Sequence, residues 1–219
     1  MRVAILNSGG KDSASAWWWA TCRGWDISQI ITVKVKGYDS HMFQIPGIEI
    51  SSVQANIAGV PYLEVTVTGE ENFEVHELKQ QIAELQIDGL VVGALRSDYQ
   101  KSRLERMTEE LGLHLWTPLW HQNGENHVRH LIENSFSVMI SSVSCDGLDD
   151  SWLGRILTLN DFNQLKNLSE KYRFHIDGEG GEYETIVLGG PHLPKGIDIK
   201  FEQHWDGKRG SITILECST

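Results

Sequence analysis

The chain has 219 residues, with 19 Lys and Arg against 30 Asp and Glu and a formal charge of −11. This length is enough for one large domain or two small ones with a substantial buried core. The negative balance argues against nucleic acid or an anionic membrane as a partner, because either would repel an acidic protein. A local basic pocket for a small anion such as a nucleotide is still compatible with it.

The cysteines and the N-terminus indicate the compartment. The chain has three cysteines, Cys22, Cys145 and Cys217, which lie far apart in the sequence. This odd number and wide spacing argue against a disulfide framework or a cysteine-rich zinc site. The chain reaches Gly9-Gly10 too early for a secretory signal. No run approaches the roughly 18 apolar residues of a membrane span. We therefore expect a cytoplasmic protein.

Short aliphatic runs alternate with longer helical patterns in the first half of the chain. The runs predict strands at 2–6, 30–36, 63–67, 89–93 and 113–116. The patterns between them predict helices at 13–23, 48–58, 72–86 and 98–111. This alternation indicates βαβ units and a parallel sheet.

The regular alternation of predicted strands and helices ends after Thr117-Pro118. Helices are predicted at 127–134 and 161–172, and strands at 136–144, 186–188, 197–201 and 211–216. We expect the last two strands to be antiparallel. The chain is therefore an α/β protein in which a first domain at 1–117 packs against a smaller α+β domain at 118–219.

A glycine-rich loop, Ser8-Gly9-Gly10-Lys11-Asp12-Ser13, separates the first predicted strand from the first helix. Glycines let the backbone turn tightly, and the free amides of a helix start attract anions. The two serine hydroxyls and the lysine complete a cradle sized for pyrophosphate. The spacing differs from the Walker loop and from the dinucleotide-binding G-x-G-x-x-G.

This loop resembles that of the PP-loop ATPases, which cleave ATP to AMP and pyrophosphate. The resemblance implies a five-stranded parallel Rossmann-like sheet of the HUP type, with strand order 3-2-1-4-5. The segment Gly93-Ala94-Leu95-Arg96-Ser97-Asp98-Tyr99-Gln100 would then lie beside the loop, at the switch point of the sheet. Gly93 would allow close approach of the nucleotide, and Val35 joins the expected nucleotide-binding residues.

Other residues of this region have two interpretations. Asp98 either contacts the nucleotide or only caps the following helix. Arg96 and Arg103 either serve the site or are solvated surface charges. We assign Tyr99 and Arg103 to the substrate side.

Two more stretches narrow the family. They are Asp39-Ser40-His41-Met42-Phe43-Gln44-Ile45-Pro46 and Glu179-Gly180-Gly181-Glu182-Tyr183-Glu184-Thr185. With the two loops above, they are similar to those of the ATP-dependent diphthine–ammonia ligases, from Val3 to about Ile214. Gln44 departs from this pattern, where a histidine is expected, and the tryptophan run 17–19 is unusual.

The resemblance implies the last step of diphthamide synthesis. ATP would adenylate the carboxylate of diphthine, a modified histidine on elongation factor 2, and ammonium would supply the nitrogen that displaces AMP. ATP and Mg²⁺ are the implied cofactors. Lys11 would neutralise the leaving pyrophosphate, while Asp12 would either help to hold Mg²⁺ or orient the loop.

The acidic segment allows competing roles, and we assign 179–185 to the protein substrate. Glu182 and Glu184 could remove a proton from the attacking nitrogen, or could bind the trimethylammonium group together with Tyr183. Because they are two residues apart, an extended segment would point both the same way. Without the resemblance, a glycine-rich turn with solvated carboxylates would be the better explanation of this segment.

Two other functions stay open, a tRNA-modifying PP-loop enzyme and a non-catalytic nucleotide-binding module. The acidic balance and the lack of paired cysteines disfavour the first. Trp17-Trp18-Trp19 covers about 300° of a helix, so some of these rings face the second half or another subunit of a homodimer. His127 and His130 fit packed or solvated side chains better than a zinc site.

Overall fold

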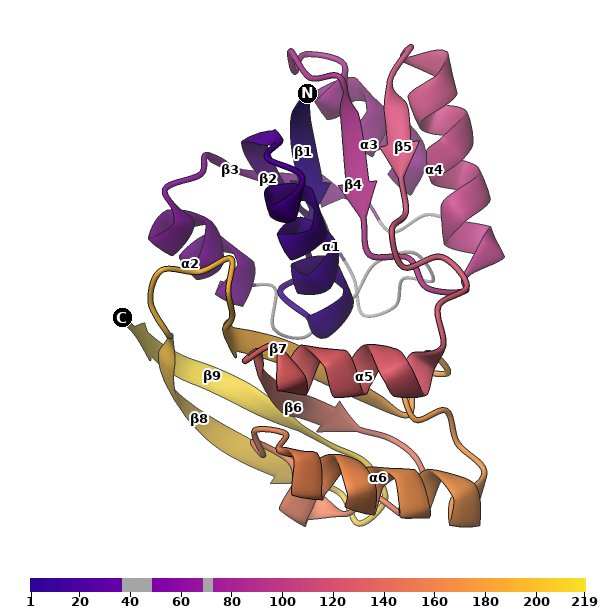
Figure 1. The fold of residues 1–219 in the computed structure, drawn as a ribbon, viewed down its shortest axis with the longest axis vertical. Coiled ribbons are helices and arrows are strands. Elements are labelled where there is room, and N and C mark those ends of the chain that lie inside the picture. Colours follow the sequence, from indigo (N-terminus) through magenta and orange to yellow (C-terminus); the bar gives the residue numbers. More distant parts are fainter. Residues whose placement is uncertain (37–48, 69–72) are drawn as a thin grey trace.

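The computed structural model describes residues 1–36, 49–68 and 73–219, which form two units, each built on its own sheet (Figure 1). The loop predicted at 39–46 lies outside the described residues. No helix in the described ranges combines the length and the apolar character that crossing a membrane would need.

The first sheet is parallel, with strand order β3-β2-β1-β4-β5, which confirms the expected topology. Its strands are β1 (Arg2–Leu6), β2 (Asp26–Val35), β3 (Tyr62–Val67), β4 (Gly89–Val92) and β5 (His114–Trp116). Its helices are α1 (Lys11–Cys22), α2 (Glu49–Ala58), α3 (Glu74–Ile82) and α4 (Asp98–Glu110). β2 begins earlier than predicted because Asp26 pairs with Arg2 of β1.

Alternation along the strands divides the core of this unit in two. Val3 and Ile5 pack with Trp17 of α1, whereas Ala4 packs with Leu104 of α4 on the opposite face. Successive side chains of a strand point to opposite faces, so helices on both sides can bury one sheet.

The second sheet is antiparallel along its paired strands, in the order β7-β6-β9-β8. Its elements are α5 (Gly124–Glu133), β6 (Ser137–Val143), η1 (Asp150–Trp152), α6 (Leu159–Tyr172), β7 (Tyr183–Gly189), β8 (Asp198–Trp205) and β9 (Gly210–Ser218). α5 begins before its predicted start because the Asn123 side chain accepts a bond from the amide of Asn126. β7 also begins earlier than predicted, because Tyr183 pairs with Val143.

The two units share a hydrophobic interface. Ala14 of α1 and Ile50 of α2 belong to the same core cluster as Val187 of β7. In Figure 1, β7 and α5 lie directly below α1, where the first unit meets the second. The division between residues 117 and 118 stays a prediction.

The three consecutive tryptophans take three different environments, as the helical spacing predicts. Trp17 is buried, Trp18 packs edge-on against Phe136 of the second unit, and Trp19 packs against Trp25. All three rings therefore pack within this chain.

His192 is buried at the interface between the units. Its ring lies 4.9 Å from that of Trp17 and 5.5 Å from that of Phe136, centroid to centroid, and neither ring nitrogen has a hydrogen-bond partner among the described residues. Burial lowers the pKa of His192 to about 4 from an ordinary 6.5. The folded chain therefore holds this ring neutral where the unfolded chain would protonate it.

We expect His192→Leu to reduce the loss of stability at acid pH. Between pH 6.5 and 4 the unfolded wild type binds a proton that the folded state refuses, so the free energy of unfolding falls as the pH drops. The variant lacks this penalty, which reaches roughly 3 kcal/mol near pH 4. Urea unfolding followed by tryptophan fluorescence at several pH values measures it. An unchanged difference across the range would contradict the prediction, and exposed His130→Leu is the matched control.

Candidate active site

A cavity of about 470 Å³ opens at the carboxyl ends of the parallel strands, between the two units. Its walls come from three stretches that the sequence places in one site: the loop at 8–13, the segment after β4, and the glycine-rich segment at 178–185. The first two flank the switch point between β1 and β4, where α/β sheets bind their ligands. The third comes from the second unit.

The phosphate loop turns through Gly9, which has a φ of +83° that favours glycine. α1 starts at Lys11, and Gly10 before it has no side chain that could cap the helix. Ser13 accepts a bond from the amide of Ser8 over 3.3 Å and donates to the carbonyl of Gly10 over 3.1 Å. Gly10, Lys11, Asp12 and Ser13 all line the cavity, so the positive end of the α1 dipole lies at its wall, where an anion is favoured.

A buried polar network supports this loop from below. The Asn7 side chain donates to Ser51 and to Gln54, and its carbonyl oxygen accepts a bond from the amide of Gly9. Gln54 in turn donates to the carbonyl of Gly9 over 3.3 Å. Such satisfied networks fix one conformation. Our sequence analysis missed these residues, although Ser51 and Gln54 are polar residues on the buried face of α2.

A chain of charges runs from the loop into the second unit. The Lys11 ammonium lies 2.7 Å from one oxygen of Asp12, and Nε2 of His127 lies 2.8 Å from the other. Burial by itself raises the pKa of Asp12, but Lys11 and His127 outweigh it and bring the pKa to about 2. Burial lowers the pKa of Lys11, yet Asp12 more than compensates and raises it. Both groups are therefore ionised at neutral pH.

The segment at 179–185 presents some of its acidic residues to the cavity and turns another away. Glu179 and Glu184 line the cavity. The Glu182 carboxylate instead accepts bonds of 2.8 Å from the amides of His175 and Gly180. The prediction that Glu182 and Glu184 face the same way is wrong, because β7 begins only at Tyr183 and Glu182 lies in the preceding turn.

Glu179 has an unusual acidity. Although the residue is exposed as a whole, loss of water around its carboxyl group and the negative charge of Asp12 raise its pKa to about 7. Asp177 adds to this rise, while Lys11 and Arg96 oppose it. Glu179 can therefore exchange a proton near neutral pH.

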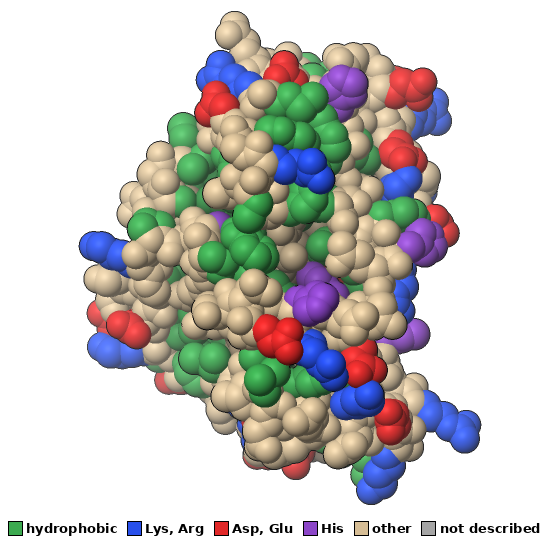
Figure 2. Space-filling model, in the orientation of Figure 1, with side chains coloured by type: hydrophobic (Ala, Val, Ile, Leu, Met, Phe, Trp, Pro, Cys, Tyr) green, Lys and Arg blue, Asp and Glu red, His purple; other side chains and the backbone are tan. Residues whose placement is uncertain are grey.

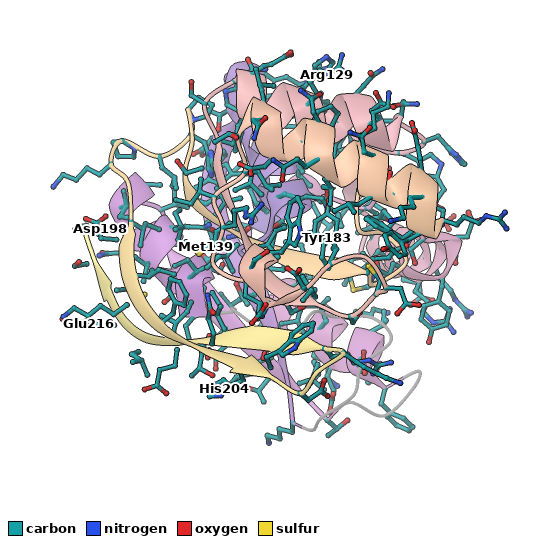
Figure 3. All side chains as sticks on the ribbon, turned by 90° about the horizontal axis from the view of Figure 1, so that it is seen from below. Arg129, Met139, Tyr183, Asp198, His204 and Glu216 are labelled. Carbon is teal, nitrogen blue, oxygen red and sulfur yellow. The ribbon has the colours of Figure 1, made fainter. Side chains whose placement is uncertain are left out.

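Tyr183 is buried and donates from its hydroxyl to the carbonyl of Ile176 over 2.5 Å. Its ring faces the Lys11 ammonium, 6.0 Å from the ring centroid. Figure 3 shows Tyr183 in the middle of the molecule, while Asp198, His204 and Glu216 lie on the β8–β9 ribbon away from it. The aromatic face is therefore already beside a cation of the protein.

Comparison with known proteins identifies the family. Residues 1–115 match the diphthamide synthase N-terminal domain, and residues 123–219 match the diphthamide synthase C-terminal domain. The chain belongs to the diphthamide synthase family.

The relatives are enzymes. Human diphthine–ammonia ligase is 33% identical over 222 residues, covering 91% of this chain and 83% of the human protein. The rat ligase is 34% identical over 223 residues, with the same shares covered. The diphthine–ammonia ligase of Schizosaccharomyces pombe is 25% identical, and this chain spans 39% of its length. This diphthamide synthase family member is accordingly an enzyme, a carbon–nitrogen ligase.

Gly93 and Asp98, in the segment after β4, have other roles in the structure than the sequence predicts. A Cβ at Gly93 would lie within 2.6 Å of backbone atoms of Asp12 and Ser13, so this glycine lets the phosphate loop itself pack closely. Ser97, not Asp98, is the residue that caps α4, by accepting a bond from the amide of Gln100. Asp98 is the first helical residue and does not line the cavity.

Three other predicted residues also lie off the cavity wall. Val35 is buried in the core, and Val33 lines the cavity instead. Tyr99 and Arg103 stack on each other along α4, with the guanidinium carbon 3.4 Å from the ring centroid. Arg103 borders a smaller hollow between α3 and α4.

Arg96 is no free surface charge. It forms an ion pair with Asp177, whose side chain is fully buried. A Cβ at Gly124 would collide with this carboxylate, so Asp177 sits at the start of α5, where the helix dipole favours a negative charge. This pair joins the segment after β4 to the second unit.

Charge on the outer surface is mixed. Figure 2 shows basic and acidic side chains side by side along the lower unit. Among the ion pairs of the second unit, Glu125 of α5 pairs with Arg129 and with Lys166 of α6. Among the described residues that line the cavity, Lys11 is the only Lys or Arg, in a protein of net charge −11.

Proposed function

We propose that the chain amidates the carboxylate of diphthine on elongation factor 2, using ATP and ammonium and releasing AMP and pyrophosphate. The observation that carries this proposal is that the phosphate loop and the acidic segment at 178–185 line one cavity. A nucleotide and a cationic protein substrate could then meet. The three unpaired cysteines fit a reducing, cytoplasmic compartment.

The first step joins the substrate carboxylate to the α-phosphate of ATP. The new bond forms between a carboxylate oxygen and the α-phosphorus, and the bond to the β-phosphate oxygen breaks. Charge then builds on the departing pyrophosphate. The Lys11 ammonium, the hydroxyls of Ser8 and Ser13, and the N-terminus of α1 would stabilise it, while the Lys11 amide itself donates to Thr185.

Magnesium fits this site as a companion of the nucleotide. Mg²⁺ bound to substrate phosphates needs only one or two carboxylates from the protein, and it neutralises phosphate charge when bound. In the described ranges no group of three or more His, Cys, Asp and Glu could hold a metal ion. Asp12 is the carboxylate of the loop that would reach the ion, directly or through water.

The second step transfers nitrogen to the acyl group. Ammonia attacks the acyl carbon and AMP leaves, but ammonium must first lose a proton. Glu179 suits this task because its pKa of about 7 lies near the working pH. Glu184 lines the cavity and would supply negative charge for the trimethylammonium group. Glu182 binds its own turn, and the Tyr183 ring faces Lys11.

The test is a product analysis with the purified chain, ATP, ammonium and diphthine-bearing elongation factor 2. We expect AMP and pyrophosphate in equal amounts with the new amide, and none when the protein substrate is left out. ADP as the product would refute the adenylation step. Binding of ATP without turnover would favour a nucleotide-binding module, and turnover with tRNA would favour the other PP-loop enzyme.

A further inference from the structure

The second unit holds the phosphate loop at three points. The amide of Val187 donates to the carbonyl of Gly9 over 2.9 Å, and Thr185 accepts a bond from the amide of Lys11 over 3.2 Å. Both contacts come from β7. The third contact, from His127 of α5 to Asp12, joins two side chains.

The third contact determines how the Asp12 carboxylate is turned. One oxygen is held by Lys11 and the other by His127, so the carboxylate cannot rotate without breaking a charge-assisted bond. Because Lys11 is bound to the same carboxylate, the place of its ammonium follows from this orientation. His127 is only 3% exposed, so solvent water has little access to replace its nitrogen.

The position of His127 depends in turn on the acidic segment. Gly124, the first residue of α5, packs closely against the carboxylate of Asp177, and Asp177 forms an ion pair with Arg96 of the first unit. The amide of Glu179 also donates to Asp177, over 3.4 Å. The cavity wall at 178–185 and the helix that carries His127 therefore share one buried anchor.

We propose that His127 is a positioning residue for the ATP-dependent step: from the second unit it holds Asp12, and through Asp12 it directs Lys11 toward the departing pyrophosphate. This inference rests on the proposed function. It means that the phosphate loop reaches its working geometry only with α5 in place. His127 itself does not line the cavity, so it would act through Asp12.

The experiment compares two polar replacements of His127 whose side chains differ in length. The amide nitrogen of His127→Gln can occupy the position of Nε2 and donate to Asp12, whereas the shorter His127→Asn cannot. We expect His127→Asn to lower kcat for pyrophosphate release about 10- to 100-fold, because small misplacements of a catalytic group have effects of this size. KM for ATP should change less, and His127→Gln should recover most of kcat.

Amide hydrogen exchange of residues 7–14 gives a second measurement that needs no turnover. Exchange should be faster in His127→Asn, near wild type in His127→Gln, and unchanged in the matched control His130→Ala, which alters an exposed residue of the same helix. Equal kcat in the two His127 variants, or unchanged exchange in His127→Asn, would overturn the positioning role. If the wild type releases no pyrophosphate, the proposed function fails, and the exchange data still decide whether His127 orders the loop.

Discussion

Lys11→Ala should lower the rate of pyrophosphate release by about 10²–10³-fold, because it removes a preorganised cation from the site where negative charge develops. Lys11 is almost fully buried and is held by Asp12, so no other described cation lines the cavity to replace it. The measurement is a steady-state assay of pyrophosphate with the complete set of substrates. Binding of the protein substrate should change little.

The control for this variant separates chemistry from folding. Lys34→Ala removes an exposed lysine that forms only a surface ion pair with Glu64, and it should leave the rate unchanged. Thermal unfolding of both variants shows whether Lys11→Ala is folded, since the change leaves Asp12 without its main counter-charge. A folded Lys11→Ala enzyme with wild-type kcat would exclude the assigned role.

Glu179→Gln should lower the rate of amide formation from ammonium about 10²–10⁴-fold, the usual contribution of a general base. Hydroxylamine is neutral at neutral pH and needs no such base, so the variant should form the hydroxamate at nearly the wild-type rate. ATP affinity should be unchanged. Equal loss with both nucleophiles would show that Glu179 acts in binding or adenylation instead.

The pH profile adds a signed expectation for Glu179. The base works when ionised, so the hydroxylamine-to-ammonium rate ratio of the wild type should fall as pH rises through about 7. Burial of the carboxyl group sets this pKa together with the charges of Asp12, Lys11, Asp177 and Arg96, and Glu179→Gln should lose this inflection. A carboxyl group whose folded pKa is raised favours the folded state at low pH. Its contribution to stability is lost as pH rises from the ordinary 4.5 through about 7.

Glu182→Gln is the matched control for this pair of measurements. Its carboxylate binds two amides of its own turn and does not line the cavity. A glutamine can accept from only one of these amides and turns its own N–H groups toward the other, so thermal unfolding must first show that the variant is folded. In the folded variant, the rates with both nucleophiles and the affinity for ATP should stay close to wild type. A loss confined to ammonium would instead return the role of base to Glu182.

The sequence was sufficient for the parallel half of the fold because its signals are local. Short apolar runs, helix periodicity and the glycines that follow helices all act within a few residues. The errors arose where pairing with a distant strand decides. Tyr183 is the first residue of β7 because Val143 lies opposite it, and Glu182 falls in the turn before the strand, where the expected extended geometry does not apply.

The same distinction holds for the site. The loop at 8–13 could be predicted to line the cavity because six consecutive residues carry its pattern. His127 is 115 residues from Asp12, and Asp177 is 81 residues from Arg96, so no local pattern could pair them. Gln54 likewise acquires its role only through contacts with Gly9 and Val187. Physical proximity in the folded chain, not spacing, creates these roles.

The hydrogen bonds that β7 and α5 form with the phosphate loop matter for protein engineering. A designer who grafts Ser8–Ser13 onto another Rossmann-like scaffold would transfer the glycines and the lysine but leave behind Thr185 and His127. The transplanted loop would keep its sequence without its outer support. The smallest portable nucleotide module in this protein is therefore a composite of both units.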